Sequence, residues 1–259
     1  FDANIPFKRM AGETIGGNLS NAQRYERALA ATLQDQLDNL TRREEVMAAE
    51  ILRTGKTIVS GDGYPATTVD FGRDAALTKA LVSENTWSGA GSKPLDNLED
   101  WAAEIQNKAG VVAKTVVMDP DAWKIFRSNA SVEKYLDYRR GTTNSLNKDP
   151  IVRGKESKAR YVGSIGDFDL WVYNDSYIND SGTLTNLLPS KTVILGSKDG
   201  LEGTRCYGAI HDEKANWTAS RYFTKSWIEE DPSVRWLLLQ SAPLVVPYRP
   251  NAVLCATIG

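Results

Sequence analysis

The sequence predicts an α+β fold that opens with one long helix and returns to long strands near its C-terminus. Residues 18–54 contain neither glycine nor proline, so nothing in them interrupts a helix. A hairpin pattern follows, then a segment in which helical and strand patterns mix, and then further apolar strand patterns. This order is typical of an α+β protein, here with two lobes of which the first is discontinuous.

Helical periodicity identifies the first element. At 100° per residue, the apolar residues of 18–54 fall within about 120° of one another and form one face. The members of this face are Ala22, Tyr25, Leu29, Leu33, Leu37, Leu40, Met47 and Ile51. Ser20 and Gln23 have the spacing of a capping box, and Gly55 can end the helix. We expect a helix about 50 Å long whose apolar face packs on the long strands.

A hairpin, a linker and a second helix are expected next. Residues 57–60 and 67–71 flank a turn that contains glycine and proline, which is a hairpin signal. Residues 83–94 are rich in Ser, Gly and Asn and are the best candidate for a domain boundary. A helix then opens at Asp96 and ends at Gly110, with Leu98, Trp101, Ala102, Ile105 and Ala109 at helical spacing.

The remaining elements are shorter. Residues 111–118 are nearly all apolar, which predicts a buried strand. Asp119 and Pro120 then provide a helix cap with proline at the first position. The helical region that follows carries Trp123, Phe126, Val132, Tyr135 and Leu136. We expect a polar loop over 141–158, and strands at 161–165, 170–173, 192–195, 206–210, 233–246 and 250–258.

Composition excludes several classes of protein. The chain has 259 residues, of which 41% are hydrophobic and 25% charged, as in a globular protein with a substantial core. A net charge of -2 argues against a dedicated nucleic-acid binder. No apolar run approaches the roughly 18 residues of a membrane span. Cys206 and Cys255 are far apart and unpatterned, so neither a disulfide framework nor a zinc site is expected.

One pair of residues could support hydrolysis. His211 is the only histidine and lies beside Asp212, so the two could activate Ser220 or Cys206 as a nucleophile. However, the chain has no Gly-x-Ser-x-Gly turn to present a serine. A histidine on the surface or at a strand end is the preferred interpretation.

Other polar clusters have structural explanations. Asn174-Asp175, Asn179-Asp180 and the Asp119/Asp121 pair supply oxygen atoms but lack the spacing of a calcium loop. The two Asn-Asp segments indicate solvated turns. The glycine pairs Gly163/Gly166 and Gly200/Gly203 lack the context of a phosphate loop. The most basic window, diluted by acidic residues, indicates a solvated loop; it comprises Lys148, Arg153, Lys155, Lys158 and Arg160.

Three tryptophans lie in segments where no core is evident, which suggests interfaces; they are Trp87, Trp217 and Trp227. Because the histidine pair and the polar clusters have structural explanations, no catalytic, cofactor-binding or metal-binding residue is assigned. We expect neither an enzyme nor a cofactor.

Residues 110–128, GVVAKTVVMDPDAWKIFRS, resemble the major capsid proteins of lambda-like tailed phages. The resemblance is collinear over most of the chain from Arg53 onward, and the first fifty residues match mainly in kind. Further matching segments are 69–73 (VDFGR), 138–141 (YRRG), 166–173, 193–196 (VILG), 207–208 (YG) and 240–244 (QSAPL).

The resemblance implies a Hong Kong 97-like shell fold. In that fold, residues 18–54 correspond to the spine helix, and residues 1–18 to a remnant of the extended loop. Residues 19–93 plus 214–246 correspond to the peripheral domain, including the long strand 233–246. Residues 94–213 plus 247–259 correspond to the axial domain. The N-terminal arm and the rest of the extended loop are expected to be missing from this chain, and without them we expect the 259-residue species to fold but not to close shells.

The resemblance also implies a function. We expect the major capsid protein of a tailed phage or prophage, which assembles with itself into pentamers and hexamers of an icosahedral shell around genomic DNA. Scaffold, portal and decoration proteins are implied partners, with non-specific DNA contact and no membrane. The implied location is the virion, after assembly in the bacterial cytoplasm. Two alternatives stay open, a nanocompartment shell protein of the same fold and a hydrolase that uses His211 and Asp212.

Overall fold

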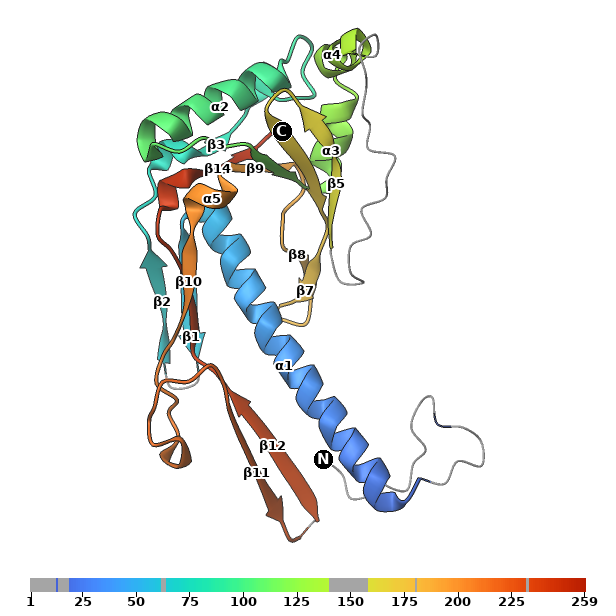
Figure 1. The fold of residues 1–259 in the computed structure, drawn as a ribbon, viewed down its shortest axis with the longest axis vertical. Coiled ribbons are helices and arrows are strands. Elements are labelled where there is room, and N and C mark those ends of the chain that lie inside the picture. Colours follow the sequence, from blue (N-terminus) through green and yellow to red (C-terminus); the bar gives the residue numbers. More distant parts are fainter. Residues whose placement is uncertain (1–12, 14–18, 62–63, 140–157, 180, 232) are drawn as a thin grey trace. The chain divides into compact units, whose positions relative to one another are not determined.

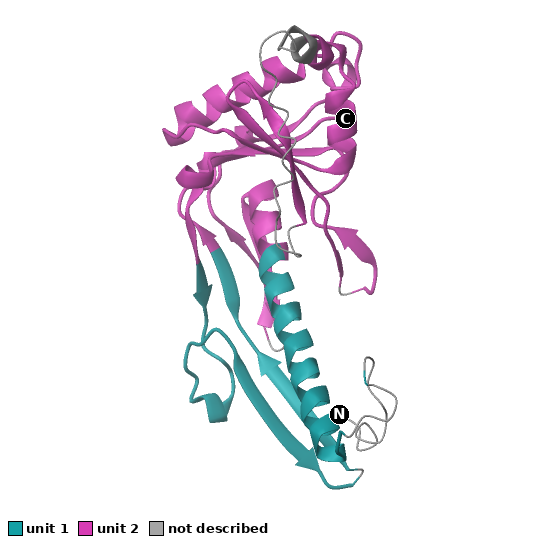
Figure 2. Ribbon diagram, turned by 45° about the vertical axis from the view of Figure 1, so that its right-hand side comes forward, with its two compact units in different colours: residues 1–45, 205–245 teal, residues 46–204, 246–259 magenta. Residues whose placement is uncertain are grey.

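The computed structural model describes residues 13, 19–61, 64–139, 158–179, 181–231 and 233–259, and Figure 1 shows the order of their helices and strands. The chain divides into two compact units (Figure 2). Unit 1 comprises residues 1–45 and 205–245, and unit 2 comprises residues 46–204 and 246–259.

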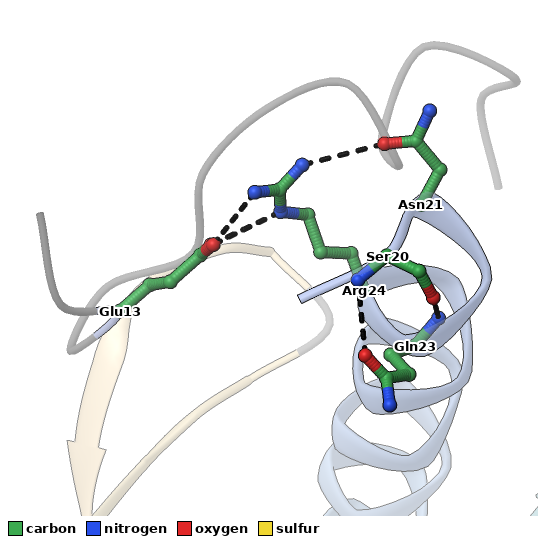
Figure 3. A network of polar contacts seen from close by, with 5 residues as sticks. All are labelled: Glu13, Ser20, Asn21, Gln23 and Arg24. Carbon is green, nitrogen blue, oxygen red and sulfur yellow. Dashed lines mark hydrogen bonds and ion pairs between the residues drawn. The ribbon is translucent and has the colours of Figure 1, made fainter. Parts of the chain in front are cut away.

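The long helix α1 (Asn21–Thr54) begins and ends where the sequence predicts. The Ser20 amide donates to Gln23 Oε1 at 2.9 Å, and the Gln23 amide donates to Ser20 Oγ at 3.3 Å (Figure 3). This reciprocal pair is the predicted capping box. Gly55, with a φ of 73°, ends the helix, and the left-handed conformation explains why a glycine stands there.

The apolar face of α1 is only partly covered within the chain. Met47 and Ile51, which belong to unit 2, are buried. Ala22, in the first turn of the helix, is exposed. The other predicted members are half-buried; they are Tyr25, Leu29, Leu33, Leu37 and Leu40.

Unit 1 combines the first part of α1 with strands from late in the chain. β11 (Phe223–Glu229) and β12 (Val234–Gln240) form an antiparallel ribbon in which Trp227 lies opposite Trp236. The ribbon runs alongside α1 in both views (Figures 1 and 2), and Gln36 Nε2 donates to Leu237 O at 3.4 Å.

The single long strand expected over 233–246 is wrong. The structure has two strands there, β12 and β13 (Pro243–Pro247), and β13 pairs with β10 (Gly203–Tyr207) instead of β11. The break lies at Ser241 and Ala242, where Ala242 O accepts a hydrogen bond from the Gly208 amide at 2.8 Å. Pro243 has no amide hydrogen with which to continue the first ladder.

Unit 2 contains a six-stranded mixed sheet in the order β3-β14-β9-β4-β6-β5. Its strands are β3 (Thr78–Ala80), β4 (Thr115–Met118), β5 (Ala159–Ile165), β6 (Phe168–Tyr173), β9 (Thr192–Gly196) and β14 (Val253–Thr257). β14 pairs with β3 in parallel and β4 with β6 in parallel, and the other neighbours are antiparallel. The last strand of the chain thus lies inside the sheet.

Helices and further hairpins complete unit 2. The α-helices are α2 (Pro94–Ala109), α3 (Pro120–Arg127), α4 (Ala130–Arg139) and α5 (Lys198–Leu201). The hairpins are β1 (Lys56–Gly61) with β2 (Tyr64–Asp70), as predicted, and β7 (Ser176–Ile178) with β8 (Leu184–Asn186). Short 3-10 turns are η2 (Ala75–Leu77), η3 (Ser83–Asn85) and η5 (Pro250–Ala252) in unit 2, and η4 (Glu213–Ala215) in unit 1.

The sheet of unit 2 is covered on both faces, and β9 is buried along its whole length. On one face, Val193 and Leu195 pack with Leu98 and Ile105 of α2 and with Phe126 of α3. On the other face, Ile194, Val253 and Cys255 pack against Leu52 near the end of α1. The nearly unbroken apolar sequence of β9 reflects burial on both sides.

The flexible linker expected at 83–94 is wrong. Trp87, in the middle of this segment, is 1% exposed and lies against Trp101 and Phe126, with ring centroids 5.9 and 5.5 Å away. Its amide donates to Ile258 O at 3.1 Å, and its indole Nε1 donates to Asn97 Oδ1 at 3.1 Å. The small polar residues around Trp87 gave no sign that its side chain lies in the core. The interface suggested for Trp87 is therefore wrong too.

The predicted cap at Asp119 is confirmed. Its carboxylate accepts hydrogen bonds from the amides of Asp121 and Ala122 at the start of α3, and from the Thr192 amide of β9. The preceding strand is shorter than the predicted 111–118, since only β4 pairs with its neighbours. The loop expected at 141–158 lies almost wholly outside the described residues.

The compact units also differ from the domain ranges expected from the sequence, because the β1–β2 hairpin groups with unit 2. The guanidinium of Arg73, just after β2, donates to Leu52 O at 2.7 Å, to Arg53 O and to Thr78 Oγ1. These bonds join the base of the hairpin to the end of α1 and to β3. The assignment of peripheral and axial domains stays a prediction.

Leu98→Ala should lower the free energy of unfolding by about 2–5 kcal/mol, because Leu98 is fully buried beneath the sheet. Leu184→Ala is the matched control: Leu184 is 68% exposed, and its loss should change stability by less than about 0.5 kcal/mol. Denaturant unfolding followed by circular dichroism measures both. Equal losses would contradict the assigned core.

Candidate interaction surfaces

Two of the residues considered for hydrolysis, Asp212 and Ser220, are held by other contacts. Asp212 accepts a hydrogen bond from Lys225 Nζ at 2.6 Å and another from the Lys214 amide at 2.8 Å, at the start of η4. These donors hold the pKa of Asp212 below its ordinary value, with Lys225 as the larger cause. Ser220 donates its hydroxyl hydrogen to Tyr222 O at 2.7 Å, so this proton points to the backbone. Asp212 therefore stabilises the loop before β11.

The Asp and Asn side chains considered as possible oxygen ligands make contacts within the fold. Asp175 pairs with Lys158 at 2.7 Å, and Asn179 accepts amide hydrogen bonds from Ser181 and Thr183 in a turn. Asp121 pairs with Lys124 at 3.0 Å. Within the part of the chain that the structure describes, no group of three or more His, Cys, Asp or Glu could hold a metal ion.

The glycine pairs occupy turns and close contacts. Gly166, with a φ of 59°, lies in the turn between β5 and β6, and Gly163 lies where the register of these strands shifts. Gly200 donates its amide to Ser197 Oγ at 3.1 Å in the short helix α5. Gly203 begins β10.

Of the basic window, Arg160 lies in β5 opposite Val172, and Lys158 pairs with Asp175. The other members, Lys148, Arg153 and Lys155, lie outside the described residues. Nor does any described helix have the length and apolar character needed to cross a membrane.

Sequence reasoning missed a buried carboxylate in unit 1. Glu44 is 5% exposed, accepts a hydrogen bond from the Tyr207 hydroxyl at 2.9 Å, and lies 3.1 Å from an Arg205 guanidinium nitrogen. It stands four residues after Leu40, on the apolar face of α1, and this position was a usable signal. Arg235 and Tyr25 make a similar link from β12, at 2.9 Å. Polar side chains therefore join α1 to the strands.

A polar network also surrounds the start of α1 (Figure 3). Arg24 donates to the Glu13 carboxylate, with a closest approach of 2.7 Å, and to Asn21 Oδ1 at 3.3 Å. The Glu13 side chain is 3% exposed. This ion pair fixes Glu13 against the first turn of the helix.

Unit 1 buries few apolar side chains of its own. Among its described residues, the buried apolar ones are Ala28, Ile210 and Ala215. Larger side chains on the ribbon stay open: Trp227, Ile228 and Trp236 are 42%, 63% and 48% exposed. A unit with so small a core and such open aromatic side chains has surface available for a partner.

Of the three tryptophans suggested for interfaces, two therefore lie at the surface. Trp227 stacks on Trp236 across the ribbon, with ring centroids 6.2 Å apart, and Trp217 is 61% exposed. Trp87 is the exception, since it forms part of the core of unit 2.

Comparisons with known proteins agree along almost the whole chain. The family model of phage major capsid protein E matches residues 1–258. The major capsid protein of Escherichia phage lambda is 30% identical over 251 residues, covering 95% of this chain and 72% of the relative. That of Enterobacteria phage phi80 is 31% identical over 233 residues, covering 88% and 67%. A crystal structure of a prophage capsid protein from E. coli CFT073 superposes with a TM-score of 0.80 at 25% identity, covering 98% and 74%.

Asp212→Asn should lower the melting temperature at pH 7, because it removes the ion pair with Lys225. A carboxyl whose pKa is depressed in the folded state stabilises the fold above its unfolded pKa and loses this contribution as the pH falls through the folded value. The difference between variant and wild type should therefore shrink in acid, below the usual range of aspartate. Thermal melts from pH 7 to pH 2 measure it.

The control is Asp167→Asn, which changes an exposed aspartate in the β5–β6 turn and should have little effect throughout. A deficit of Asp212→Asn that stayed constant or grew in acid would show that the ion pair is not its cause.

Proposed function

The chain belongs to the family of phage major capsid protein E, and on that premise we propose that it builds the icosahedral head of a tailed phage or prophage from pentamers and hexamers. It is a structural capsid protein with the phage capsid fold, and not an enzyme. Its family assembles into a shell, so the chain is a component of the virion. The number and arrangement of subunits belong to the proposal.

The match over residues 1–258 carries this proposal, because it includes both compact units. The surface of unit 1 supports it independently. A subunit that must bind neighbours on several sides has to leave apolar area uncovered until it assembles, and Trp227, Ile228 and Trp236 provide such area.

The mechanism we propose is association without chemistry. Side-to-side contacts between different surfaces close rings of subunits, and rings join into a shell. Each contact must bury enough area to exceed the loss of rigid-body freedom, which in stable interfaces means more than about 1,000 Å². The apolar core of unit 2 would hold its shape while unit 1 gains cover from neighbours.

We also propose parts and partners. In this proposal α1 is the spine helix, residues 19–93 plus 214–246 form the peripheral domain, and residues 94–213 plus 247–259 form the axial domain. Scaffold, portal and decoration proteins would bind the shell during assembly in the host cytoplasm. Packaged DNA would be met non-specifically, which a net charge of -2 permits because tight phosphate binding is not required.

Expressed from its complete gene, the protein should form closed shells or curved sheets at micromolar concentration, visible by electron microscopy and of megadalton mass by light scattering. The reason is that identical subunits with complementary side surfaces continue to add until the assembly closes. The control is to dissociate the particles in denaturant and then remove it. Shells should form again from the dissociated subunits, whereas irregular aggregates should not give closed particles. Monomers at every concentration and salt would contradict the proposal.

A further inference from the structure

The β11–β12 ribbon has two faces, and only one of them packs on α1. Side chains alternate along both strands, so cross-strand partners share a face. Arg235 contacts Tyr25 of α1 at 2.9 Å, which turns the face of Arg235 toward the helix. The residues directly before and after it along the strand point away from α1.

The face turned away from α1 is here named the tryptophan face. Its members are Phe223, Lys225, Trp227, Glu229, Val234, Trp236, Leu238 and Gln240. Trp227 and Trp236 are partners in the register, and their rings stack with an interplanar angle of 15°. The two indoles are nearly half exposed in the chain by itself.

The sequence of β12 indicates that both faces become covered. Leu237, Leu238 and Leu239 follow one another, so leucine lies on both sides of the strand. A strand open to water on one side normally alternates polar and apolar residues, whereas continuous apolar runs are typical of strands covered on both sides. α1 covers part of the first face. On the second face Lys225 bonds Asp212 of the same unit, but the two indoles beyond it stay open and are available to a partner.

The charges on this face favour a second copy of the same chain. Lys225 lies two residues before Trp227, and Glu229 lies two residues after it, on the same face of β11. A two-fold axis that runs across the strands between two such faces reverses the strand direction. It therefore brings Lys225 of each copy opposite Glu229 of the other, with the indoles in the centre. Such a self-complementary patch is what an isologous contact requires.

The local contacts of the two charged side chains keep them in place for this pairing. Lys225 Nζ bonds to Asp212 and lies 5.6 Å from the ring centroid of Trp227. Glu229 accepts a hydrogen bond from the indole Nε1 of Trp236 at 2.9 Å. An ammonium has three donor hydrogens and a carboxylate about four lone-pair positions, so each can make a further bond.

We propose that the tryptophan face binds the tryptophan face of a second copy of this chain, about a two-fold axis that pairs Lys225 with Glu229 across the contact. The contact deepens the proposed shell assembly and rests on it. In this contact the stacked indoles of both copies lie at the centre, and two Lys225–Glu229 ion pairs lie at the rim.

The first test identifies the neighbour of Lys225. Subunits labelled with nitrogen-14 and nitrogen-15 are mixed before assembly and treated with a carbodiimide, which joins an amine to a carboxylate in direct contact. Mass spectrometry should find Lys225 linked to Glu229 in peptides of mixed isotope. A link between Lys225 and Asp212 within one isotope is the internal control, because these atoms lie 2.6 Å apart in the same chain.

The second test removes the centre of the contact. The double variant Trp227→Ser with Trp236→Ser should weaken association of dissociated subunits by at least about tenfold in sedimentation, as loss of central aromatic residues does. Tyr248→Ser is the control, since Tyr248 is 60% exposed in unit 2 and should leave association unchanged. If the double variant does not fold by circular dichroism, Glu229→Lys takes its place and should also weaken association.

The outcomes separate the contact from the function. Shells that form normally with no mixed Lys225–Glu229 link, or a folded variant that associates like wild type, would overturn this contact and leave the capsid function intact. A wild-type protein that never associates would overturn both. A link from Lys225 to a carboxylate other than Glu229 in another copy would assign the face to a different contact and overturn the two-fold arrangement.

Discussion

Unit 2 depends on the burial of one indole. The ring of Trp87 lies between Trp101 of α2 and Phe126 of α3, and every polar group of the residue has a partner. Its amide bonds to Ile258 O beyond β14, and its carbonyl accepts from Asn129 and Ser92. A buried tryptophan whose indole N–H were unpaired would cost stability, so these bonds make the position workable. One side chain thereby joins two helices, the segment before α2 and the C-terminal end.

The two units are stabilised in different ways, and this difference fits a protein that assembles. Unit 2 has a dense apolar core on both faces of its sheet. Unit 1 joins α1 to its strands largely through polar pairs, such as Glu44 with Tyr207 and Tyr25 with Arg235. Polar pairs fix register and orientation without hiding apolar area. The leucines and indoles of unit 1 are thus positioned by their own chain while part of their surface is still open to a neighbour.

The sequence predicted elements with strong local signals and failed where long-range contacts decide. The capping box at Ser20, the glycine stop at Gly55 and the Asp119 cap are encoded within a few residues, and all three are confirmed. The prediction for Trp87 failed because its sequence neighbours are small and polar, whereas its burial depends on Trp101 and Phe126. Pro243 predicts the break between β12 and β13, whereas the apolar residues on either side of it predict one continuous strand. The buried position of the Glu44 carboxylate depends on contacts with Tyr207 and Arg205, which are distant in sequence.

Because unit 1 is discontinuous in sequence, its two parts are synthesised at different times. Its helical part ends at residue 45, whereas its strands begin at residue 205. At about 5–20 residues per second, the ribosome needs roughly 10–30 s to make the intervening chain. Throughout that interval Leu29, Leu33 and Leu37 have no strand on which to pack, although their helix can already form. The nascent chain therefore exposes an apolar helix face for many seconds. Neighbouring ribosomes on one mRNA would bring the exposed faces of two nascent chains close together before either chain has folded.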